Sequence, residues 1–182
     1  FSSIVGENSG TTGRALAAYS SDWVGWYSGA PPAWVRPANT AEVAALVTWA
    51  NETKTAIVPV RGTTGLNGGT HAEGAVMLSL DRLNKIREMR ADARVAVVAA
   101  GVIMSQLHEA ADGLNLVFPM TFGAKGSAMI GGMLSTNAGG SNVLRYGNTR
   151  DLCLGLEVVT PQGEIMDLMG ALHKDNSGIN LK

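Results

Sequence analysis

The sequence is poor in cysteine and aromatic residues and has no excess of either charge. A single thiol, Cys153, excludes a disulfide within the chain and fits a reducing compartment. The 14 Lys and Arg residues nearly balance 15 Asp and Glu residues, and the net charge of -1 argues against nucleic acid as a partner. No apolar run approaches the roughly 18 residues of a membrane span. We expect a soluble, cytoplasmic protein, with peripheral association with the inner membrane as an alternative.

Glycine, in contrast, is abundant and unevenly distributed. The 182 residues include 23 glycines, nearly twice the usual share of about 7%. Five lie between Gly62 and Gly74, and seven lie between Gly123 and Gly147. Because 46% of the residues are hydrophobic and only 16% are charged, the chain is expected to fold. The two glycine-rich stretches are therefore expected to be loops of a folded protein.

Hydrophobic periodicity predicts the elements around the first glycine-rich loop. Residues 40–51 place apolar side chains at helical spacing, with Asn39 or Thr40 as the N-cap. Short apolar runs at residues 56–60 and 75–80 indicate strands. The expected order is helix, strand, glycine loop, strand.

The second half of the chain has a different pattern. A third strand is expected from Arg94, followed by a helix at residues 103–111 that Gly113 caps. Ser127 is a candidate N-cap for a short helix in the second glycine-rich loop. The segments on either side of the turn at residues 161–163 are expected to form a β-hairpin.

These elements together predict an α+β protein with two subdomains. An N-terminal segment, residues 1–34, precedes a small α/β subdomain at residues 35–90 and a mixed, antiparallel α+β subdomain at residues 91–182. Phe1 is not an initiator methionine, and the chain ends within a pattern. We therefore expect a processed or truncated piece of a longer protein, with an incomplete second subdomain.

The glycine loops match neither of two common phosphate-binding motifs. The chain has no Gly-Lys pair, which a P-loop requires. Gly62, Gly65 and Gly68 are spaced by threes before a predicted strand, whereas the Rossmann motif is G-x-G-x-x-G before a helix. A long turn is the simpler interpretation of one such loop. Two loops with hydroxyl and amide side chains suit an extended dinucleotide, because glycines let backbone N–H groups approach phosphate.

Three segments carry a family resemblance: VRPANTAEVAALV, VPVRGTTGLNGG and FPMTFGAKGSAMIGGMLSTNAGGSNVLRYGNTRDLCLGLEVVTPQGEI. In this order they resemble the FAD-binding domain, of the PCMH type, of the vanillyl-alcohol oxidase superfamily. Within it they are most similar to the D-lactate, glycolate and D-2-hydroxyglutarate dehydrogenases. The resemblance covers residues 23–182 and implies a two-subdomain fold with FAD between the subdomains.

The resemblance also implies which residues bind FAD. The first loop would surround the pyrophosphate with backbone N–H groups, and the second would line the pyrophosphate and the flavin ring. The implied cofactor-binding residues are Arg61, Gly62, Thr63, Thr64, Gly65, Leu66, Gly123, Ala124, Ser127, Ile130, Gly131, Thr136, Asn137, Ala138, Gly139 and Gly140. Relatives with covalent flavin often carry histidine in the first loop, where this sequence has Thr63 and Thr64. FAD is therefore expected to be bound non-covalently.

The implied activity is that of an FAD-dependent oxidoreductase acting on CH-OH donors, a D-2-hydroxy acid dehydrogenase that moves a hydride from the substrate α-carbon to flavin N5. The 2-hydroxy acid would bind a C-terminal domain beyond residue 182, so this chain alone is expected to be inactive, and no catalytic residue is assigned in it. The electrons would pass to a quinone or an electron-transfer protein, and a homodimer is compatible with the sequence. Two alternatives stay open: another flavoenzyme of the superfamily, of the aryl-alcohol oxidase or ether-lipid synthase type, and a non-catalytic nucleotide-binding module.

Several polar residues lie outside these loops. His71, His108 and His173 lack the spacing of metal ligands, so no metal site is expected, and His108 is expected to face solvent. Glu157 lies in an apolar strand, which suggests a hydrogen bond to the backbone or to a ligand.

The remaining interpretations concern packing. Arg145 and Tyr146 could approach the flavin or form a packing pair, and the sequence favours neither. Cys153 is expected to be a buried core thiol rather than a nucleophile. The aromatic residues of the N-terminal part are expected to pack mainly against the core. They are Tyr19, Trp23, Trp26, Tyr27 and Trp34.

Overall fold

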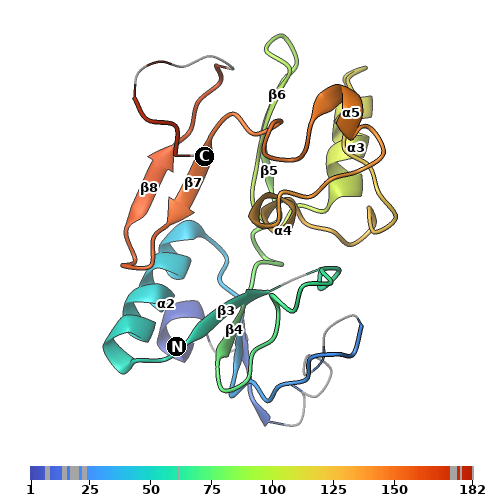
Figure 1. Ribbon diagram of the computed structural model, residues 1–182. Coiled ribbons are helices and arrows are strands. Elements are labelled where there is room, and N and C mark those ends of the chain that lie inside the picture. Colours follow the sequence, from blue (N-terminus) through green and yellow to red (C-terminus); the bar gives the residue numbers. More distant parts are fainter. Residues whose placement is uncertain are drawn as a thin grey trace. The chain divides into compact units, whose positions relative to one another are not determined.

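The computed structural model describes residues 1–6, 9–13, 16, 21, 24–60, 62–172, 176 and 178–181 (Figure 1). The chain has the expected α+β fold and forms two compact units. The first unit comprises Phe1–Leu83 and Val159–Ile165, and the second comprises Asn84–Val158 and Met166–Lys182. None of the helices in the described ranges combines the length and hydropathy needed to cross a membrane.

The first unit is built on a four-stranded sheet in the order β1-β2-β4-β3. Strands β2 and β3 run parallel to β4, and β1 runs antiparallel to β2. The core lies between the sheet and helix α2, where Leu46 is fully buried in one cluster with Val35, Val76 and Leu78. The elements are α1 (Ser2–Val5), β1 (Gly10–Thr11), β2 (Trp34–Val35), α2 (Thr40–Thr53), β3 (Ile57–Val60) and β4 (Val76–Ser79).

Helix α2 confirms the helix predicted at residues 40–51. Its N-cap is Asn39, whose side chain accepts a hydrogen bond from the Glu42 N–H at 2.9 Å. The Glu42 carboxylate in turn accepts a hydrogen bond from the Ala38 N–H at 2.8 Å. These bonds satisfy N–H groups at the start of the helix, where no intrahelical acceptor exists. The helix ends before Lys54, which has a left-handed φ of 55°.

The strands predicted on either side of the first glycine-rich loop are confirmed as β3 and β4. They are parallel neighbours, and their register runs from Ile57 opposite Val76 to Val60 opposite Ser79. Parallel neighbours need a crossover connection of about a dozen residues or more, usually a helix. Here residues 61–75 make the crossover with no helix among those described. The glycine loop therefore begins at the carboxyl end of β3, the end where open α/β sheets bind ligands.

The second unit combines the β5–β6 hairpin and most of strands β7 and β8 with short helices, while the turn between β7 and β8 belongs to the first unit. Strands β5 and β6 pair antiparallel, and β7 and β8 form a second two-stranded sheet that confirms the predicted hairpin. The predicted third strand and the helix at residues 103–111 are confirmed as β6 and α3. The elements are β5 (Ile86–Arg90), β6 (Val95–Val98), α3 (Met104–Asp112), α4 (Ile130–Ser135), α5 (Val143–Tyr146), β7 (Leu156–Val159) and β8 (Ile165–Leu168).

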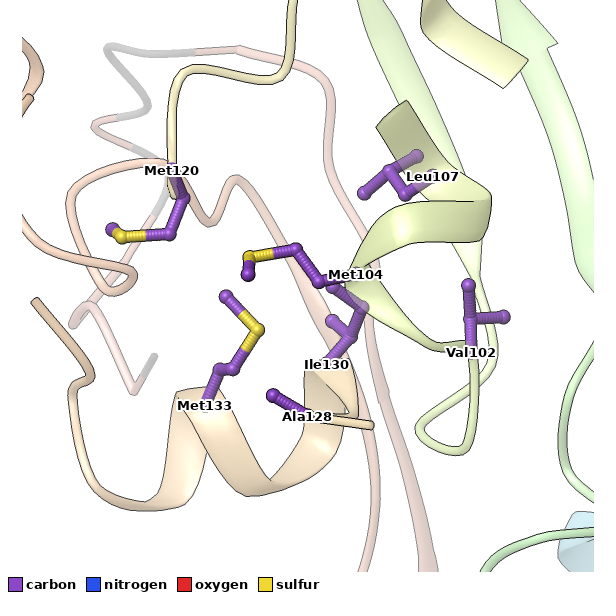
Figure 2. Close-up of a cluster of buried hydrophobic side chains, with 7 residues drawn as sticks. All are labelled: Val102, Met104, Leu107, Met120, Ala128, Ile130 and Met133. Atoms are coloured by element: carbon purple, nitrogen blue, oxygen red, sulfur yellow. The ribbon is translucent and has the colours of Figure 1, made fainter. Parts of the chain in front are cut away.

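The core of the second unit is rich in methionine. Figure 2 shows its buried side chains, with Met104 and Met133 pointing toward one another. Unbranched methionine side chains fill irregular space, which suits a core assembled from short helices and loops. The cluster consists of Val102, Met104, Leu107, Met120, Ala128, Ile130 and Met133.

Strand β5 is an element that the sequence does not predict. Its five residues read IREMR, and three of them, Arg87, Glu88 and Arg90, are charged. Such a segment shows no apolar run, and its pairing with β6 depends on backbone hydrogen bonds that composition does not reveal.

Of two predicted helix caps, one is wrong and one is confirmed. Helix α4 begins at Ile130 with Met129 as its N-cap, while Ser127 lies in the preceding turn and donates its hydroxyl to the Ala124 carbonyl. Gly113 is confirmed as the C-cap of α3, but with a right-handed φ of -60°, so the left-handed freedom of glycine is not used there. The left-handed residue after this helix is Asn115, with φ of 55°.

The aromatic residues of the N-terminal part do not share one environment. Trp34 is 9% exposed and lies in the core, as expected. Trp26 and Tyr27 are 76% and 44% exposed, so the expectation that they pack into the core is wrong. Tyr19 and Trp23 lie outside the described residues.

Candidate functional site

The first glycine-rich loop presents consecutive backbone N–H groups without protein partners. Among the described residues, none accepts a hydrogen bond from the N–H groups of residues 62–68. The first hydrogen bond within the loop runs from the Gly69 N–H to the Asn67 side chain, at 3.1 Å. Gly62 and Thr63 both have positive φ values, of 74° and 43°. The loop thus carries a strip of donors of the kind that binds phosphate oxygens.

The fold does not require the glycine at position 65. A Cβ on Gly65 would meet only the Asn67 side-chain oxygen, at an ordinary contact distance of 3.6 Å. Gly68 differs, because a Cβ there would lie 2.7 Å from the Tyr27 ring. The glycine at position 68 is explained by packing within the chain, whereas the one at position 65 leaves room for a ligand.

Side chains of the first glycine-rich loop are also accessible to a ligand. Thr63 and Thr64 are half-buried, and their hydroxyls have no hydrogen-bond partner in the described part of the chain. Leu66 is 64% exposed. Arg61, which the sequence also implicates, lies outside the described residues.

The second glycine-rich loop begins with an exposed turn. The Lys125 N–H donates to the Phe122 carbonyl at 3.1 Å, and the Ala128 N–H donates to the Ala124 carbonyl at 2.9 Å. A Cβ on Gly123 would have no described neighbour within 4 Å. Gly123, like Gly65, therefore has no packing reason to be glycine.

Ile130 and Gly131, the next residues that the resemblance implicates in FAD binding, are packed within the second unit. Ile130 is 8% exposed and lies in the methionine-rich core. A Cβ on Gly131 would lie 2.7 Å from the Ala100 Cβ, and the Gly131 N–H donates to the Ala100 carbonyl at 2.8 Å. The glycine at position 131 thus allows α4 to approach the segment that follows β6.

Residues 136–140 leave helix α4 and form the last implicated segment. Asn137 has a left-handed φ of 48°. The hydroxyl of Thr136 donates back to the Gly132 carbonyl at 3.0 Å, so it is occupied within the helix. The N–H groups of Gly139 and Gly140 find no acceptor among the described residues. This segment therefore offers a second, shorter set of donors.

The structure brings the two parts of the second loop together. The Ser141 N–H donates to the Thr121 carbonyl at 3.0 Å, and the Asn142 side chain donates to the Pro119 carbonyl at 2.8 Å. A Cβ on Gly140 would collide with the Thr121 carbonyl oxygen. Residues 139–142 are thus held beside residues 119–121, directly before the exposed turn at Gly123.

Thr149 is a residue near the site that the sequence does not single out. It is 3% exposed, and both its hydroxyl and its N–H donate to the Ala138 carbonyl, at 2.7 and 3.0 Å. Threonine in a polar run usually marks a surface turn. No pattern in the sequence distinguishes this buried threonine from the exposed ones.

His108 is not the solvent-facing residue that was expected. It is half-buried, its Nε2 lies 2.8 Å from the Met120 carbonyl oxygen, and its ring packs near Phe118. No cluster that could hold a metal ion occurs among the described residues, and His173 lies outside them.

The presence of Glu157 in an apolar strand is explained by an ion pair within the chain rather than by a ligand. The Arg87 guanidinium donates to both of its carboxylate oxygens, at 2.9 and 3.2 Å. The hydrogen bond to Glu157 raises the pKa of the Arg87 guanidinium above its usual value. Both residues lie on strands, β5 and β7, so the pair links segments that are distant in sequence.

Arg145, Tyr146 and Cys153 are placed by local contacts. The Arg145 guanidinium lies over the Tyr146 ring, 5.1 Å from its centre, which is the packing pair that the sequence left open. Cys153 is half-buried, and its Sγ lies 3.4 Å from the Gly155 carbonyl oxygen. The expectation of a fully buried thiol is therefore wrong.

The site residues fit a phosphate-bearing cofactor such as FAD. In the first unit, the N–H groups of residues 62–68 have no acceptor among the described residues, and Gly65 lets a ligand approach the backbone. In the second unit, the same holds by itself for the N–H groups of Gly139 and Gly140 and for the space at Gly123. The implicated residues that are described carry no titratable side chain, so they are equipped to bind and orient a cofactor rather than to transfer protons.

Known proteins are similar to this chain in sequence. The family model described as "FAD binding domain" matches residues 31–169. Over 168 residues, the chain is 45% identical to D-2-hydroxyglutarate dehydrogenase of Xanthomonas citri pv. viticola and 37% identical to D-2-hydroxyglutarate–pyruvate transhydrogenase of Saccharomyces cerevisiae. Each alignment covers 92% of this chain but only 36% and 34% of these relatives. The chain thus spans about a third of their length.

A solved structure of alkyldihydroxyacetonephosphate synthase shares the fold. The TM-score is 0.82 at 20% sequence identity, and the likeness covers 96% of this chain and 33% of that one. The chain belongs to the FAD-binding domain family that the matching family model describes.

Proposed function

We propose that this chain is the FAD-binding portion of a flavin-dependent D-2-hydroxy acid dehydrogenase. The observation that carries the proposal is the strip of N–H donors at residues 62–68, which no acceptor in the described residues engages. The pyrophosphate of FAD needs such donors, and the family match spans both glycine-rich loops. The substrate class is inferred from relatives named for D-2-hydroxyglutarate.

In this proposal the chain binds and orients the cofactor. The N–H groups of residues 62–68 donate to the pyrophosphate, and those of Gly139 and Gly140 donate to the pyrophosphate or the flavin ring. Gly65 and Gly123 keep the backbone open to the ligand. The chemistry that FAD supplies when bound is acceptance of the substrate α-hydrogen as a hydride at N5. The substrate itself is bound by a part of the protein outside this chain.

The mode of attachment and the partners belong to the same proposal. FAD is held non-covalently, because Thr63 and Thr64 stand where covalent relatives carry histidine. The electrons leave through a quinone or an electron-transfer protein. A cytoplasmic location is proposed from the balanced charge and the single cysteine, with peripheral association with the inner membrane as the alternative.

Turnover by the full-length protein tests the proposal. The purified protein is expected to be yellow and to reduce a dye acceptor with D-2-hydroxyglutarate, D-lactate or glycolate. L-2-hydroxyglutarate and L-lactate serve as matched controls and are expected to give no reduction. The acid with the highest kcat/KM identifies the substrate. A yellow protein that oxidises none of these acids would favour an aryl-alcohol oxidase or ether-lipid synthase type instead.

Ligand titration separates the enzyme from a non-catalytic nucleotide-binding module. The full-length apoprotein is titrated with FAD, ADP and inorganic phosphate by calorimetry. We expect strong preference for FAD, because ADP and phosphate engage only part of the donors. Equal affinity for ADP and FAD, or a colourless protein that FAD does not reconstitute, would contradict the flavin assignment.

A further inference from the structure

Thr149 is one of two polar residues that are buried in the described part of the chain, and the other is Ser79. Ser79 is explained by its hydrogen bond to Asp81, at 2.9 Å, within a polar network of the first unit. Thr149 has no charged partner among the described residues, and both of its donors, the N–H and the hydroxyl, bind one group, the carbonyl of Ala138. Burial of a hydroxyl is unfavourable unless it is hydrogen-bonded, so this contact is the reason the residue is tolerated.

Thr149 and Arg150 hold Ala138 and Asn137 in place by hydrogen bonds. The Thr149 N–H and hydroxyl donate to the Ala138 carbonyl at 3.0 and 2.7 Å. The next residue, Arg150, donates its N–H to the Asn137 side-chain oxygen at 3.0 Å. Asn137 and Ala138 therefore have a fixed orientation at the start of the segment that ends in Gly139 and Gly140.

The orientation of the Ala138 carbonyl determines where the next N–H group points. No cis peptide bond occurs among the described residues. In a trans peptide the C=O and the following N–H point in opposite directions. Because the Ala138 carbonyl points to Thr149, the Gly139 N–H points away from it. Gly139 is exposed, and its N–H has no acceptor within the described ranges.

The same reasoning applies to the Asn137 side chain. An N–H group donates to its oxygen, so the amide nitrogen must face the other way. Asn137 is exposed, and its amide nitrogen has no acceptor among the residues described. The turn at Thr149 and Arg150 thus leaves two donor groups, the Asn137 amide nitrogen and the Gly139 N–H, exposed and without an acceptor among the described residues.

We propose that Thr149 is a positioning residue for the cofactor. It acts through the Ala138 carbonyl to hold the Gly139 N–H in the direction needed to donate to FAD. This inference rests on the proposed function. A donor fixed before binding loses little conformational entropy when the ligand arrives, and that is the benefit of burying this hydroxyl.

The test uses the full-length protein and three variants. Thr149→Val removes the hydroxyl and keeps the shape, and Thr149→Ser restores the hydroxyl. The matched control is Thr53→Val, because the Thr53 hydroxyl also donates to a backbone carbonyl, that of Trp49 at 2.8 Å, but lies at the end of α2. The measurements are the Kd for FAD of each apoprotein, the flavin absorption spectrum and the thermal unfolding midpoint.

The expected result is specific to cofactor binding. Thr149→Val should bind FAD about fivefold to tenfold more weakly, the equivalent of one hydrogen bond, and its flavin spectrum should shift. Thr149→Ser should return to the wild-type Kd and spectrum. Thr53→Val should keep the wild-type Kd and the wild-type flavin spectrum, even if its thermal unfolding midpoint changes.

Other results would overturn the inference. A wild-type Kd and spectrum in Thr149→Val would show that the residue has only a structural role. If that variant does not fold, Thr149→Cys provides a weaker donor in the same place, and an unchanged Kd would again overturn the inference. Failure of the wild-type protein to bind FAD would instead refute the proposed function. This outcome therefore distinguishes a failure of the proposed function from a failure of the inference about Thr149.

Discussion

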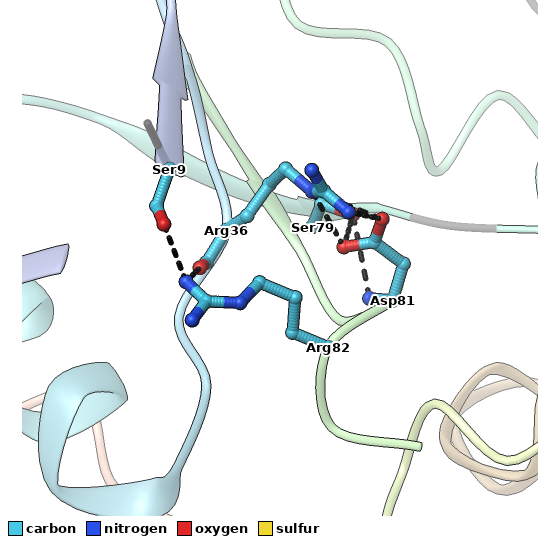
Figure 3. A network of polar contacts seen from close by, with 5 residues as sticks. All are labelled: Ser9, Arg36, Ser79, Asp81 and Arg82. Atoms are coloured by element: carbon cyan, nitrogen blue, oxygen red, sulfur yellow. Dashed lines mark hydrogen bonds and ion pairs between the residues drawn. The ribbon is translucent and has the colours of Figure 1, made fainter. Parts of the chain in front are cut away.

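Asp81 binds the Arg36 guanidinium through both of its carboxylate oxygens. The Arg36 Nε lies 3.1 and 3.0 Å from the two oxygens, and Nη2 lies 2.7 Å from Oδ2 (Figure 3). The same carboxylate accepts the hydroxyl of the fully buried Ser79. Arg36 follows β2 and Asp81 follows β4, so the pair stabilises two parallel strands of the first unit.

We expect Asp81→Asn to lower the free energy of unfolding by about 1 to 2 kcal/mol. The substitution removes the negative charge and turns an amide N–H toward groups that are themselves donors. Because the Arg36 side chain is 36% exposed, water compensates part of the loss. Urea denaturation measures the change. Glu88→Gln, which breaks an exposed pair with Arg90, is the control and should not shift the midpoint; equal shifts in the two variants would contradict the prediction.

Gly65→Ala is expected to weaken FAD binding about tenfold without destabilising the apoprotein. The added Cβ has room in the chain but would stand between the backbone N–H groups and a bound pyrophosphate. Fluorescence titration of the full-length apoprotein with FAD gives the Kd. Gly113→Ala is the matched control, because its Cβ would meet only ordinary contacts outside both loops. If both variants bind FAD as the wild type does, the first loop does not approach the cofactor at this position.

Gly140→Ala, unlike Gly65→Ala, is expected to destabilise the apoprotein. Its Cβ would collide with the Thr121 carbonyl oxygen and lie 3.0 Å from the Met120 sulfur. Such overpacking should lower the free energy of unfolding of the apoprotein by about 1 to 3 kcal/mol. Chemical denaturation in the absence of FAD checks this, with Gly113→Ala again as the control. An unfolding midpoint equal to that of the wild type would show that the loop at residues 139–142 moves aside easily.

Flavin should leave the denatured protein completely. Because Thr63 and Thr64 offer no side chain that forms a covalent bond to the flavin, acid precipitation should release all yellow colour into the supernatant. Mass spectrometry of the denatured polypeptide should show the unmodified mass. A mass increase equal to that of FAD, or a yellow pellet, would refute non-covalent attachment.

Local sequence signals predict the elements that depend on local interactions. Asn39 and Glu42 form the cap of α2 within a few residues of one another, so the start of that helix can be read directly from the sequence. Strand β5 depends on pairing with β6, and its Arg87 meets Glu157 seventy positions later. Composition alone does not reveal such partners.

The sequence by itself determined that two loops are rich in glycine and hydroxyl groups, and it indicated a dinucleotide. Only the tertiary structure decided what each glycine does. Gly131 and Gly140 are required because Ala100 and Thr121 approach their backbones, whereas Gly65 and Gly123 have open space. The physical reason is that close backbone approach is set by residues far away in the sequence, and a glycine needed for packing has the same side chain as one needed for a ligand.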